Sequence, residues 1–259
     1  MKRLFTPEGE AALQETMQRH PLLAFDFDGT LAPIVARPGD ARVPAPVAHR
    51  LQRLAGRLPV AVVSGRSVQD VRRRLLFTPW RIVGNHGAED DGSSTADDQA
   101  AVLAPARAGL VAQAGPLRAA GVMVEDKGLS IALHYRLASD AAGAQHAISE
   151  VVARLPPSLA VFGGKMVVNI VAARSRDKAD AVAALVAASG TQTAVFVGDD
   201  VNDEPVFVRA EPDWLTVRVG HDDPRSSARW FLDGPADLPR LLDRMLESLS
   251  EPGGSPDEI

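Results

Sequence analysis

The chain of 259 residues contains no cysteine, which excludes disulfide bonds, thiolate metal sites and a cysteine nucleophile. It also lacks any apolar run near the roughly 20 residues that span a bilayer. The nearest candidate, the alanine-rich segment 179–189, is shorter and has a charge at its start. Residues 1–21 carry acids and amides where a signal peptide would need an uninterrupted apolar stretch. We therefore expect a cytoplasmic protein that has no membrane as a partner.

A strong excess of positive charge is missing as well. The formal net charge is −5, so the chain has no general attraction for nucleic acid or anionic lipid, and we expect no nucleic acid partner. The basic run VRRRLL at residues 71–76 is interpreted as a solvated helix face. A small anionic substrate would need local cations. The sequence leaves the oligomeric state open, with a monomer favoured.

Short apolar runs alternate with helical stretches along much of the chain. The runs LLAF, PVAVV, RIV, AVFV and LTVRV are typical of buried parallel strands. Helices are predicted from Thr6 and Pro7 to about His20, over residues 44–58, and over residues 67–77. This alternation predicts an α/β fold with a doubly wound, Rossmann-like parallel-sheet core.

The middle of the chain departs from this pattern. A helix over residues 105–120 precedes two strands joined at residues 126–128, and a helix over residues 140–155 precedes two strands joined at Gly163 and Gly164. Hairpins backed by helices form a small α+β unit. We expect an inserted α+β cap domain at residues 105–172, between core segments 1–104 and 173–259. The polar segments 90–99 and 251–259 are assigned no structure.

Acidic residues follow two of the predicted core strands. Asp26 and Asp28 leave the first strand two positions apart, so they face the same side. Asp199, Asp200 and Asp203 follow the run AVFV and reach the same edge if the sheet is parallel. Such a cluster needs a cation, and an all-oxygen set of ligands suits a hard ion. The sequence therefore predicts a Mg²⁺ site, and with it a phosphate ester as substrate.

Two further features could bind phosphate. Ser64 and Gly65 end the run PVAVV and offer a hydroxyl and an unhindered backbone N–H. Lys178 is one of only four lysines against twenty-four arginines, which indicates a need for a compact ammonium at that position.

Four ordered motifs give the chain a resemblance to a known family. DFDGT, VVSGRS, SRDKA and GDDVNDE resemble the motifs of the haloacid dehalogenase superfamily of phosphatases. The segments GNHGAE, VEDKGLSIALHYR and GGKMVVNI resemble those of its trehalose-6-phosphate phosphatase branch. The similarity extends over residues 22–219, and the inserted unit stands where this superfamily carries an α+β cap.

The resemblance implies a role for each residue of the motifs. Asp26 would be the nucleophile that forms an aspartyl-phosphate, and Asp28 the general acid and base. Asp26, the backbone carbonyl of Asp28, and Asp199 would bind Mg²⁺. Ser64 and Lys178 would hold the phosphoryl oxygens. Asp200 and Asp203 would orient water or the lysine without touching the metal.

The resemblance also implies that the cap and the loops beneath it recognise a sugar. The residues expected to bind substrate are Gly65, Arg66, His86, Glu89, Glu125, Lys127, Lys165 and Asn169. Glu125 and Lys127 are two positions apart and share a strand face, and we expect Lys165 and Asn169 to share another. The implied function is hydrolysis of trehalose 6-phosphate to trehalose and phosphate.

Three positions depart from the family pattern. Asn169 stands in place of a usual Glu, Ala179 in place of a usual Gly, and Asn202 in place of a usual Thr. Because of Asn169, another sugar phosphate, such as a sucrose or glucosylglycerate phosphate, stays open as the substrate. A catalytically silent sugar-phosphate sensor and a phospho-accepting signalling module are further alternatives.

Several of these residues have simpler interpretations. Asp203 and Glu204 could be acids in a first helical turn, and this is the favoured interpretation of Glu204. His86 could be a turn residue, and Glu125 with Lys127 a surface charge pair. His134 and Arg136 are expected to support the fold of the inserted unit.

Overall fold

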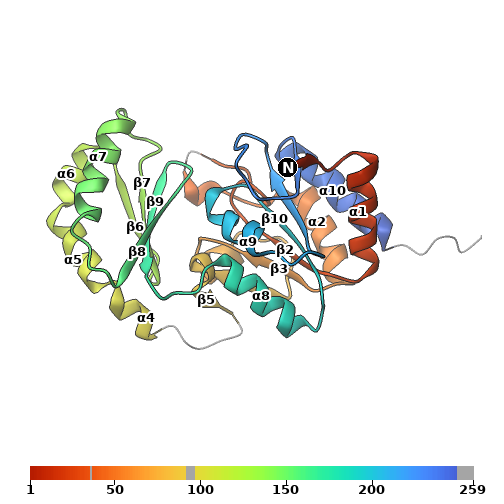
Figure 1. The fold of residues 1–259 in the computed structure, drawn as a ribbon. Coiled ribbons are helices and arrows are strands. Elements are labelled where there is room, and N and C mark those ends of the chain that lie inside the picture. Colours follow the sequence, from red (N-terminus) through yellow and green to blue (C-terminus); the bar gives the residue numbers. More distant parts are fainter. Residues whose placement is uncertain (36, 92–96, 250–259) are drawn as a thin grey trace, which may run out of the picture.

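The computed structural model describes residues 1–35, 37–91 and 97–249. Two sheets lie side by side, each with helices packed on it (Figure 1). The larger sheet has the strand order β1 (Lys2–Arg3), β12 (Trp230–Leu232), β11 (Leu215–Val219), β10 (Ala194–Gly198), β2 (Leu22–Phe25), β3 (Val60–Val63), β4 (Arg81–Gly84) and β5 (Glu89–Asp90). Neighbouring strands are parallel except for β4 and β5. The predicted doubly wound α/β core is therefore confirmed.

Helices cover both faces of the larger sheet, because its strands are apolar on both sides. Leu23 and Phe25 of β2 pack with α1 (Pro7–Gln18), α2 (Ala45–Ala55) and α10 (Leu238–Ser248). Leu22 and Ala24 pack on the other face with α8 (Lys178–Ser189) and α9 (Glu204–Arg209). This alternation along one strand is what the predicted buried parallel sheet requires.

Capping residues set where the predicted core helices begin. The side chain of Thr6 accepts a hydrogen bond from the backbone N–H of Gly9 at the start of α1. Ser67 accepts from the N–H of Asp70 in the same way at the start of α3 (Val68–Arg72). The helix predicted over residues 67–77 is shorter than expected, because α3 ends at Arg72. The chain turns away at Arg74, whose carbonyl accepts from Val43 N–H.

The smaller sheet is antiparallel, with the order β6 (Met123–Asp126), β7 (Ser130–His134), β9 (Val167–Ala172) and β8 (Leu159–Gly164). Its helices lie on the face that points away from the core: α5 (Ala104–Ala112), α6 (Ala114–Ala119) and α7 (Ala141–Val152) (Figure 1). Ile131, Leu133 and Ile170 pack against this helical layer. The opposite face of the smaller sheet is turned toward the carboxyl ends of the core strands.

Two predictions for the smaller sheet need correction. The expected helix over residues 105–120 is divided at Gln113 into α5 and α6, because Pro116 cannot donate to the preceding turn. The second hairpin turns at Lys165 and Met166, whereas Gly163 and Gly164 end β8 opposite Val168 and Val167. Lys165 thus lies at the hairpin tip and not on a strand.

The expected division of the chain at residues 105 and 172 stays a prediction. The hydrophobic cluster of the smaller sheet includes Leu103 and Ala106. In the polar segment 90–99, where no structure was expected, Asp90 belongs to β5 and α4 (Asp97–Val102) begins. Residues 92–96 and the tail 251–259 lie outside the described residues. Among the described residues, no helix combines the length and the apolar character needed to span a bilayer.

Candidate active site

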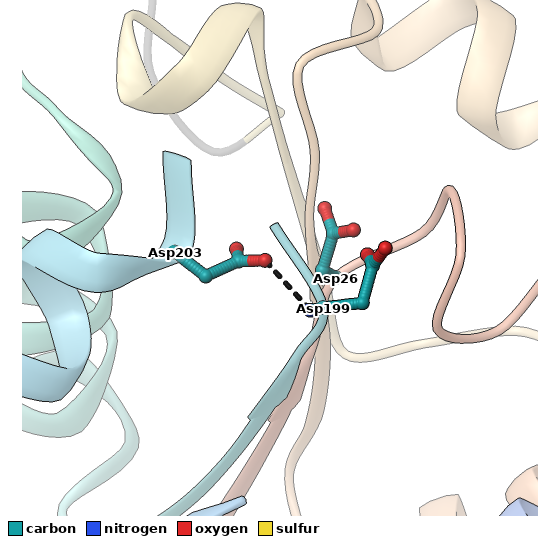
Figure 2. Close-up of side chains that lie close together, drawn as sticks. All are labelled: Asp26, Asp199 and Asp203. Carbon is teal, nitrogen blue, oxygen red and sulfur yellow. Dashed lines mark hydrogen bonds between the residues drawn. The ribbon is translucent and has the colours of Figure 1, made fainter. Parts of the chain in front are cut away.

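Acidic residues gather at the carboxyl ends of β2 and β10. These strands are neighbours, with Phe25 paired to Val197, and Asp26 and Asp199 lie just beyond their ends. One carboxylate oxygen each of Asp26, Asp199 and Asp203 lies within 4.8 Å of the others. Figure 2 shows the carboxylates of Asp26 and Asp199 side by side above the strand ends, while Asp203 approaches from the neighbouring turn. The structure thus brings together acids that are distant in the sequence.

Asp203 has a different task from the other two aspartates. Its Oδ2 accepts a hydrogen bond from the backbone N–H of Asp199 at 2.9 Å (Figure 2). The same oxygen of Asp203 accepts from the backbone N–H of Asp200 at 3.0 Å. Its Oδ1 accepts from Nζ of Lys178 at 2.7 Å. Both oxygens of Asp203 are therefore occupied, Oδ2 by the loop after β10 and Oδ1 by Lys178, which leaves Asp26 and Asp199 as the acids with the better access to a cation.

The two interpretations of residues 203 and 204 can be compared directly. Asp203 closes a short 3₁₀ turn (Val201–Asp203) that Asp200 caps, and it also contacts Lys178 within the cluster. Glu204 begins α9 and bonds to Arg218 and to the backbone N–H of Ser227. Glu204 therefore lies in the first turn of α9, as the simple interpretation requires.

Lys178 is the buried cation of the cluster. It begins α8, where Asp177 and Asp180 form a reciprocal capping box, and its side chain is 1% exposed. Its Nζ donates to Oδ1 of Asp26 at 2.6 Å. Burial alone would lower the pKa of Lys178, but the charges of Asp203 and Asp26 outweigh burial and raise it. The ammonium is therefore charged and fixed beside Asp26.

The charges of the cluster do not balance. Burial raises the pKa of Asp26 well above its usual value; Lys178 opposes this rise, and Asp203 and Asp199 add to it. Burial, followed by the charge of Asp203, raises the pKa of Asp199 to about 6. A divalent cation would relieve this repulsion, and carboxylate oxygens are the ligands that a hard ion such as Mg²⁺ prefers. The donor set at Asp26 and Asp199 therefore fits Mg²⁺.

The loop after β3 carries the predicted phosphate-binding residues. Ser64 is fully buried, and its Oγ accepts from the backbone N–H of Arg66 at 3.1 Å. Gly65 lies against the ring of His86: a Cβ atom at position 65 would be 2.3 Å from Cε1 of that ring. Only glycine fits this approach without a shift. The guanidinium of Arg66 makes two bonds to Asp28 and one to Asp70.

The inner face of the smaller sheet presents a row of paired residues. Glu125 of β6 pairs with Ala132, Ala132 with Asn169, and Asn169 with Phe162 of β8. Paired residues point to the same face, so this row crosses the sheet opposite the acidic cluster. Nε2 of His134 lies 2.8 Å from Oε2 of Glu125, and this hydrogen bond lowers the pKa of Glu125 despite its partial burial.

Side chains from the smaller sheet reach the core at several points. Nζ of Lys165 donates to Asp199 at 2.5 Å, and its backbone N–H donates to Asp200 at 3.0 Å. Nζ of Lys127 donates to the carbonyl of Gly65 at 3.0 Å. Burial lowers the pKa of Lys127. The hairpin tips of this sheet therefore contact both the acidic cluster and the loop after β3.

These contacts enclose a pocket between the two sheets. Of the residues predicted for the site, the pocket is lined by Asp26, Asp28, Gly65, Arg66, His86, Glu125, Lys127, Lys165, Asn169, Asp199 and Asp200. Although Lys165 lies on a turn, it and Asn169 face this common pocket. His86 is buried with its ring edge-on to Phe162, at 4.8 Å between centroids. Burial, and then the charges of Lys127 and Lys178, lower the pKa of His86, so its imidazole is neutral.

Four predicted residues do not line this pocket: Ser64, Glu89, Lys178 and Asp203. Lys178 and Asp203 lie beneath it and bond to each other and to the cluster. The carboxylate of Glu89 accepts from the backbone N–H of Val68 and from Asn85. The structure thus places Glu89 as a support of the loop, and not at the wall where a substrate contact was expected.

The sequence interpretation missed several residues of the site. Thr30 Oγ1 donates to Asp199, and Arg136, which follows β7, donates to the carbonyl of Val35 in the loop after β2 at 2.8 Å. Arg136 and His134, which were expected only to support the inserted unit, both line the pocket. Nothing in the sequence indicated that Val35 would lie opposite.

Solved structures share the fold. The C-terminal domain of a Candida albicans trehalose-6-phosphate phosphatase has a TM-score of 0.79 at 18% identity and covers 92% of this chain and 96% of that one. A trehalose-6-phosphate phosphatase related protein has a TM-score of 0.71 at 23% identity. The match covers 87% of this chain and 98% of that protein. At these identities the likeness concerns the fold alone.

Relatives in sequence are closer. A trehalose-phosphate phosphatase of Mycolicibacterium paratuberculosis is 36% identical over 255 residues, which is 91% of this chain and 64% of the relative. A trehalose-phosphate phosphatase of Mycobacterium tuberculosis is 34% identical over 248 residues, which is 90% of this chain and 63% of the relative. The chain therefore spans less than two thirds of the length of these relatives. The family model described as trehalose-phosphatase matches residues 24–236, and the chain thus belongs to the trehalose-phosphatase family.

Proposed function

We propose that this protein is a Mg²⁺-dependent phosphatase that hydrolyses trehalose 6-phosphate to trehalose and phosphate through an aspartyl-phosphate. The observation that carries the proposal is the setting of Asp26. It lies at the end of a central strand, 2.6 Å from the buried ammonium of Lys178 and close to Asp199, at the bottom of a pocket. Membership of the trehalose-phosphatase family supplies the substrate class.

Asp26 would act as the nucleophile. Lys178 occupies Oδ1, so Oδ2 is the oxygen that would attack phosphorus. The new P–O bond forms to Asp26 as the P–O bond to the sugar breaks, and Asp28 gives its proton to the departing sugar oxygen. Water then attacks the acyl-phosphate and passes a proton to Asp28. Phosphate leaves, and Asp26 and Asp28 return to their starting states.

Lys178 and Ser64 would stabilise the charge on the phosphoryl group. The ammonium of Lys178 is fixed by Asp26 and Asp203, so it needs no reorganisation during the reaction. The buried hydroxyl of Ser64 lies at the end of β3, the strand that neighbours β2. Neither side chain lines the pocket, so the phosphoryl group would have to bind at the strand ends, next to Asp26, to meet them.

Asp26 and Asp199 would hold the metal, with the backbone carbonyl of Asp28 as a further ligand. When bound, Mg²⁺ would neutralise the excess negative charge and polarise a phosphoryl oxygen. Asp203 would keep the loop after β10 in the shape that presents Asp199, through its bonds to two backbone N–H groups. Asp200 would hold the hairpin tip at Lys165 through its contact with the backbone N–H.

Residues 105–172 would form a cap that recognises the sugar. Glu125, Lys127, Lys165 and Asn169 reach the pocket from this unit and offer both donors and acceptors. The cavity measures about 140 Å³. Ligand pockets usually measure about 300 Å³ or more, so a disaccharide phosphate would need the cap to open before it enters. Closure would then exclude water from the reacting group.

A second candidate substrate rests on Asn169. Its neutral amide lies in the middle of the inner row, where the family resemblance leads one to expect a carboxylate. An amide keeps one acceptor oxygen but loses the negative charge and the second oxygen with which a carboxylate accepts in a bidentate way. A different disaccharide or glycosyl phosphate is therefore the alternative. The cytoplasmic location and the monomeric state stay predictions.

The deciding experiment measures phosphate release from a panel of disaccharide and monosaccharide phosphates with Mg²⁺, with and without EDTA. We expect trehalose 6-phosphate to give the highest kcat/KM and EDTA to abolish turnover reversibly. Asp26→Asn should lower kcat by about 1000-fold or more. Full activity in Asp26→Asn would end the assignment of the nucleophile, and preference for another sugar phosphate would favour the second candidate.

The aspartyl-phosphate and the cap each have a separate test. Acid quenching during turnover of ³²P-labelled substrate should leave label on the wild-type protein and none on Asp26→Asn. Glu125→Ala should impair hydrolysis of the sugar phosphate much more than that of 4-nitrophenyl phosphate. Equal losses on the two substrates would remove the proposed role of the cap in recognition.

A further inference from the structure

Arg66 and Asp28 form a two-point pair at the edge of the pocket. Nε of Arg66 donates to Oδ2 of Asp28 and Nη2 donates to Oδ1, both at 2.7 Å. The Arg66 side chain is 8% exposed, whereas that of Asp28 is 41% exposed. A parallel pair of charge-assisted bonds fixes the plane of a carboxylate as well as its position. The buried guanidinium therefore sets the direction of the more exposed carboxylate.

The guanidinium is itself held in place from behind. Nη1 of Arg66 donates to Asp70 at 2.8 Å, and Arg74 makes two bonds to the same carboxylate, at 2.6 and 2.9 Å. The guanidinium carbon also lies 5.4 Å from the centre of the Phe27 ring. Asp70 belongs to α3, so a helix of the core anchors the chain of contacts that ends at Asp28.

A direct contact with substrate is the other role open to Arg66, and it was the role expected from the sequence. Each of the three guanidinium nitrogens already donates to a carboxylate. A phosphate or sugar oxygen that bonded to either N–H facing Asp28 would therefore have to displace that carboxylate. Burial alone would lower the pKa of Arg66, but its bonds to the two aspartates raise it.

We propose that Arg66 is a positioning residue that orients Asp28 for proton transfer to and from the leaving oxygen. The inference rests on the proposed phosphatase function. Before the first step Asp28 takes up a proton from solvent. In that step the bond from phosphorus to the leaving oxygen breaks, the bond to Asp26 forms, and this proton moves from Asp28 to the leaving oxygen. Asp28 is then a carboxylate, which the two N–H groups of Arg66 stabilise. In that orientation it receives the proton of the hydrolytic water.

Aryl phosphates separate this role from sugar binding, because they carry no sugar hydroxyls. 4-Nitrophenolate leaves readily without a proton, whereas the more basic phenolate needs one. General acid catalysis is worth about 10²- to 10⁴-fold. We therefore expect Arg66→Gln to lower kcat/KM for phenyl phosphate about tenfold or more beyond its effect on 4-nitrophenyl phosphate. Equal losses on the two substrates would overturn the proposal.

The double variant with Asp28→Asn supplies a second readout. If Arg66 acts through Asp28, Asp28→Asn alone should give the same increase in leaving-group dependence, and adding Arg66→Gln should increase it no further. Additive effects would contradict the proposal. Arg66→Lys keeps the charge but loses the two-point contact, so it should resemble Arg66→Gln and serves where the glutamine variant does not fold.

Arg50→Gln is the matched control. Arg50 makes the same two-point contact with Asp243, at 2.7 and 2.9 Å, between α2 and α10 and away from the pocket. Arg50→Gln should leave the ratio of kcat/KM for phenyl phosphate to kcat/KM for 4-nitrophenyl phosphate unchanged. A changed ratio would show that breaking any ion pair alters the dependence on the leaving group. Absence of phosphatase activity in the wild type would refute the proposed function itself. An active wild type with an unaltered ratio in both Arg66 variants would refute only the role of Arg66.

Discussion

The Nζ atom of Lys165 lies 2.5 Å from Oδ2 of Asp199, so the tip of the β8–β9 hairpin places an ammonium on the acidic cluster of the core. The backbone N–H of Lys165 also donates to Asp200. Burial alone would lower the pKa of Lys165, but the charge of Asp199 outweighs burial and raises it. One oxygen of the proposed metal ligand is therefore already paired with a cation.

Lys165→Met should bind Mg²⁺ more tightly than the wild type in the absence of substrate. A metal at Asp199 competes with the ammonium, and the Lys165 side chain is 34% exposed, so the gain should be modest, about two- to fivefold in Kd. Titration calorimetry would measure it. Lys127→Met is the control, since Nζ of Lys127 bonds to a carbonyl outside the cluster. An unchanged Kd in Lys165→Met would contradict this prediction, because it would show that the ammonium of Lys165 does not compete with the metal for Asp199.

The meeting of Asp26 with Asp199 could be predicted because both follow fully apolar runs. Buried parallel strands end at one edge of their sheet, so the acids after them converge whatever the loops between them do. The turn of the β8–β9 hairpin was harder to place. Gly163 and Gly164 are the stronger local turn signal, but the pairing of Val161 with Ile170 sets the register and moves the turn to Lys165.

The roles of Arg66 and Glu89 could not be predicted from their motifs. Each could contact a substrate or support a loop, and the choice depends on partners that are distant in the sequence. Arg66 lies against Asp28, and Glu89 against the backbone N–H of Val68. Residue type and spacing carry no information on such pairs. The helix break at Gln113 could have been predicted, because Pro116 follows three residues later.

Gly65→Ala should reduce both activity and stability. The added Cβ would lie 2.3 Å from Cε1 of His86, so the ring or the loop after β3 must move. Such overpacking usually costs about 1–3 kcal/mol. Chemical denaturation and the KM for the sugar phosphate would measure the two effects. Gly56→Ala is the control: its Cβ would meet neighbours at 3.6 and 3.8 Å, so its stability should be equal or greater. Similar losses in both variants would contradict the argument.

Asp70 should contribute to the stability of the fold in a pH-dependent way. Burial opposes its ionisation, but hydrogen bonds from Arg74 and Arg66 outweigh burial and lower its pKa below the usual 3.8. A lowered pKa in the folded state means that the contribution is present above the pKa of the unfolded chain and is lost as the pH falls through the folded value. Between about pH 5 and 3, the free energy of unfolding should therefore fall less steeply in Asp70→Asn than in the wild type. Parallel curves would contradict this assignment.

Ser130→Ala should destabilise the contact between the two sheets. The hydroxyl of Ser130 donates to Oδ1 of Asn85 at 2.6 Å, and the two residues are 0% and 1% exposed. Without this donor a buried carbonyl oxygen lacks a partner, which costs about 1–3 kcal/mol. Each kcal/mol should lower the midpoint of thermal unfolding by about 2–4 °C in a chain of this size.

Ser149→Ala is the matched control for that change. Its hydroxyl bonds to the carbonyl of Gln145 on an exposed turn of α7, where water can replace it. The midpoint of Ser149→Ala should therefore stay close to that of the wild type. Because Asn85 also bonds to Glu89, loss of Ser130 should in addition speed amide hydrogen exchange in the loop between β4 and β5. A wild-type midpoint and unchanged exchange in Ser130→Ala would mean that this buried bond does not hold the cap to the core.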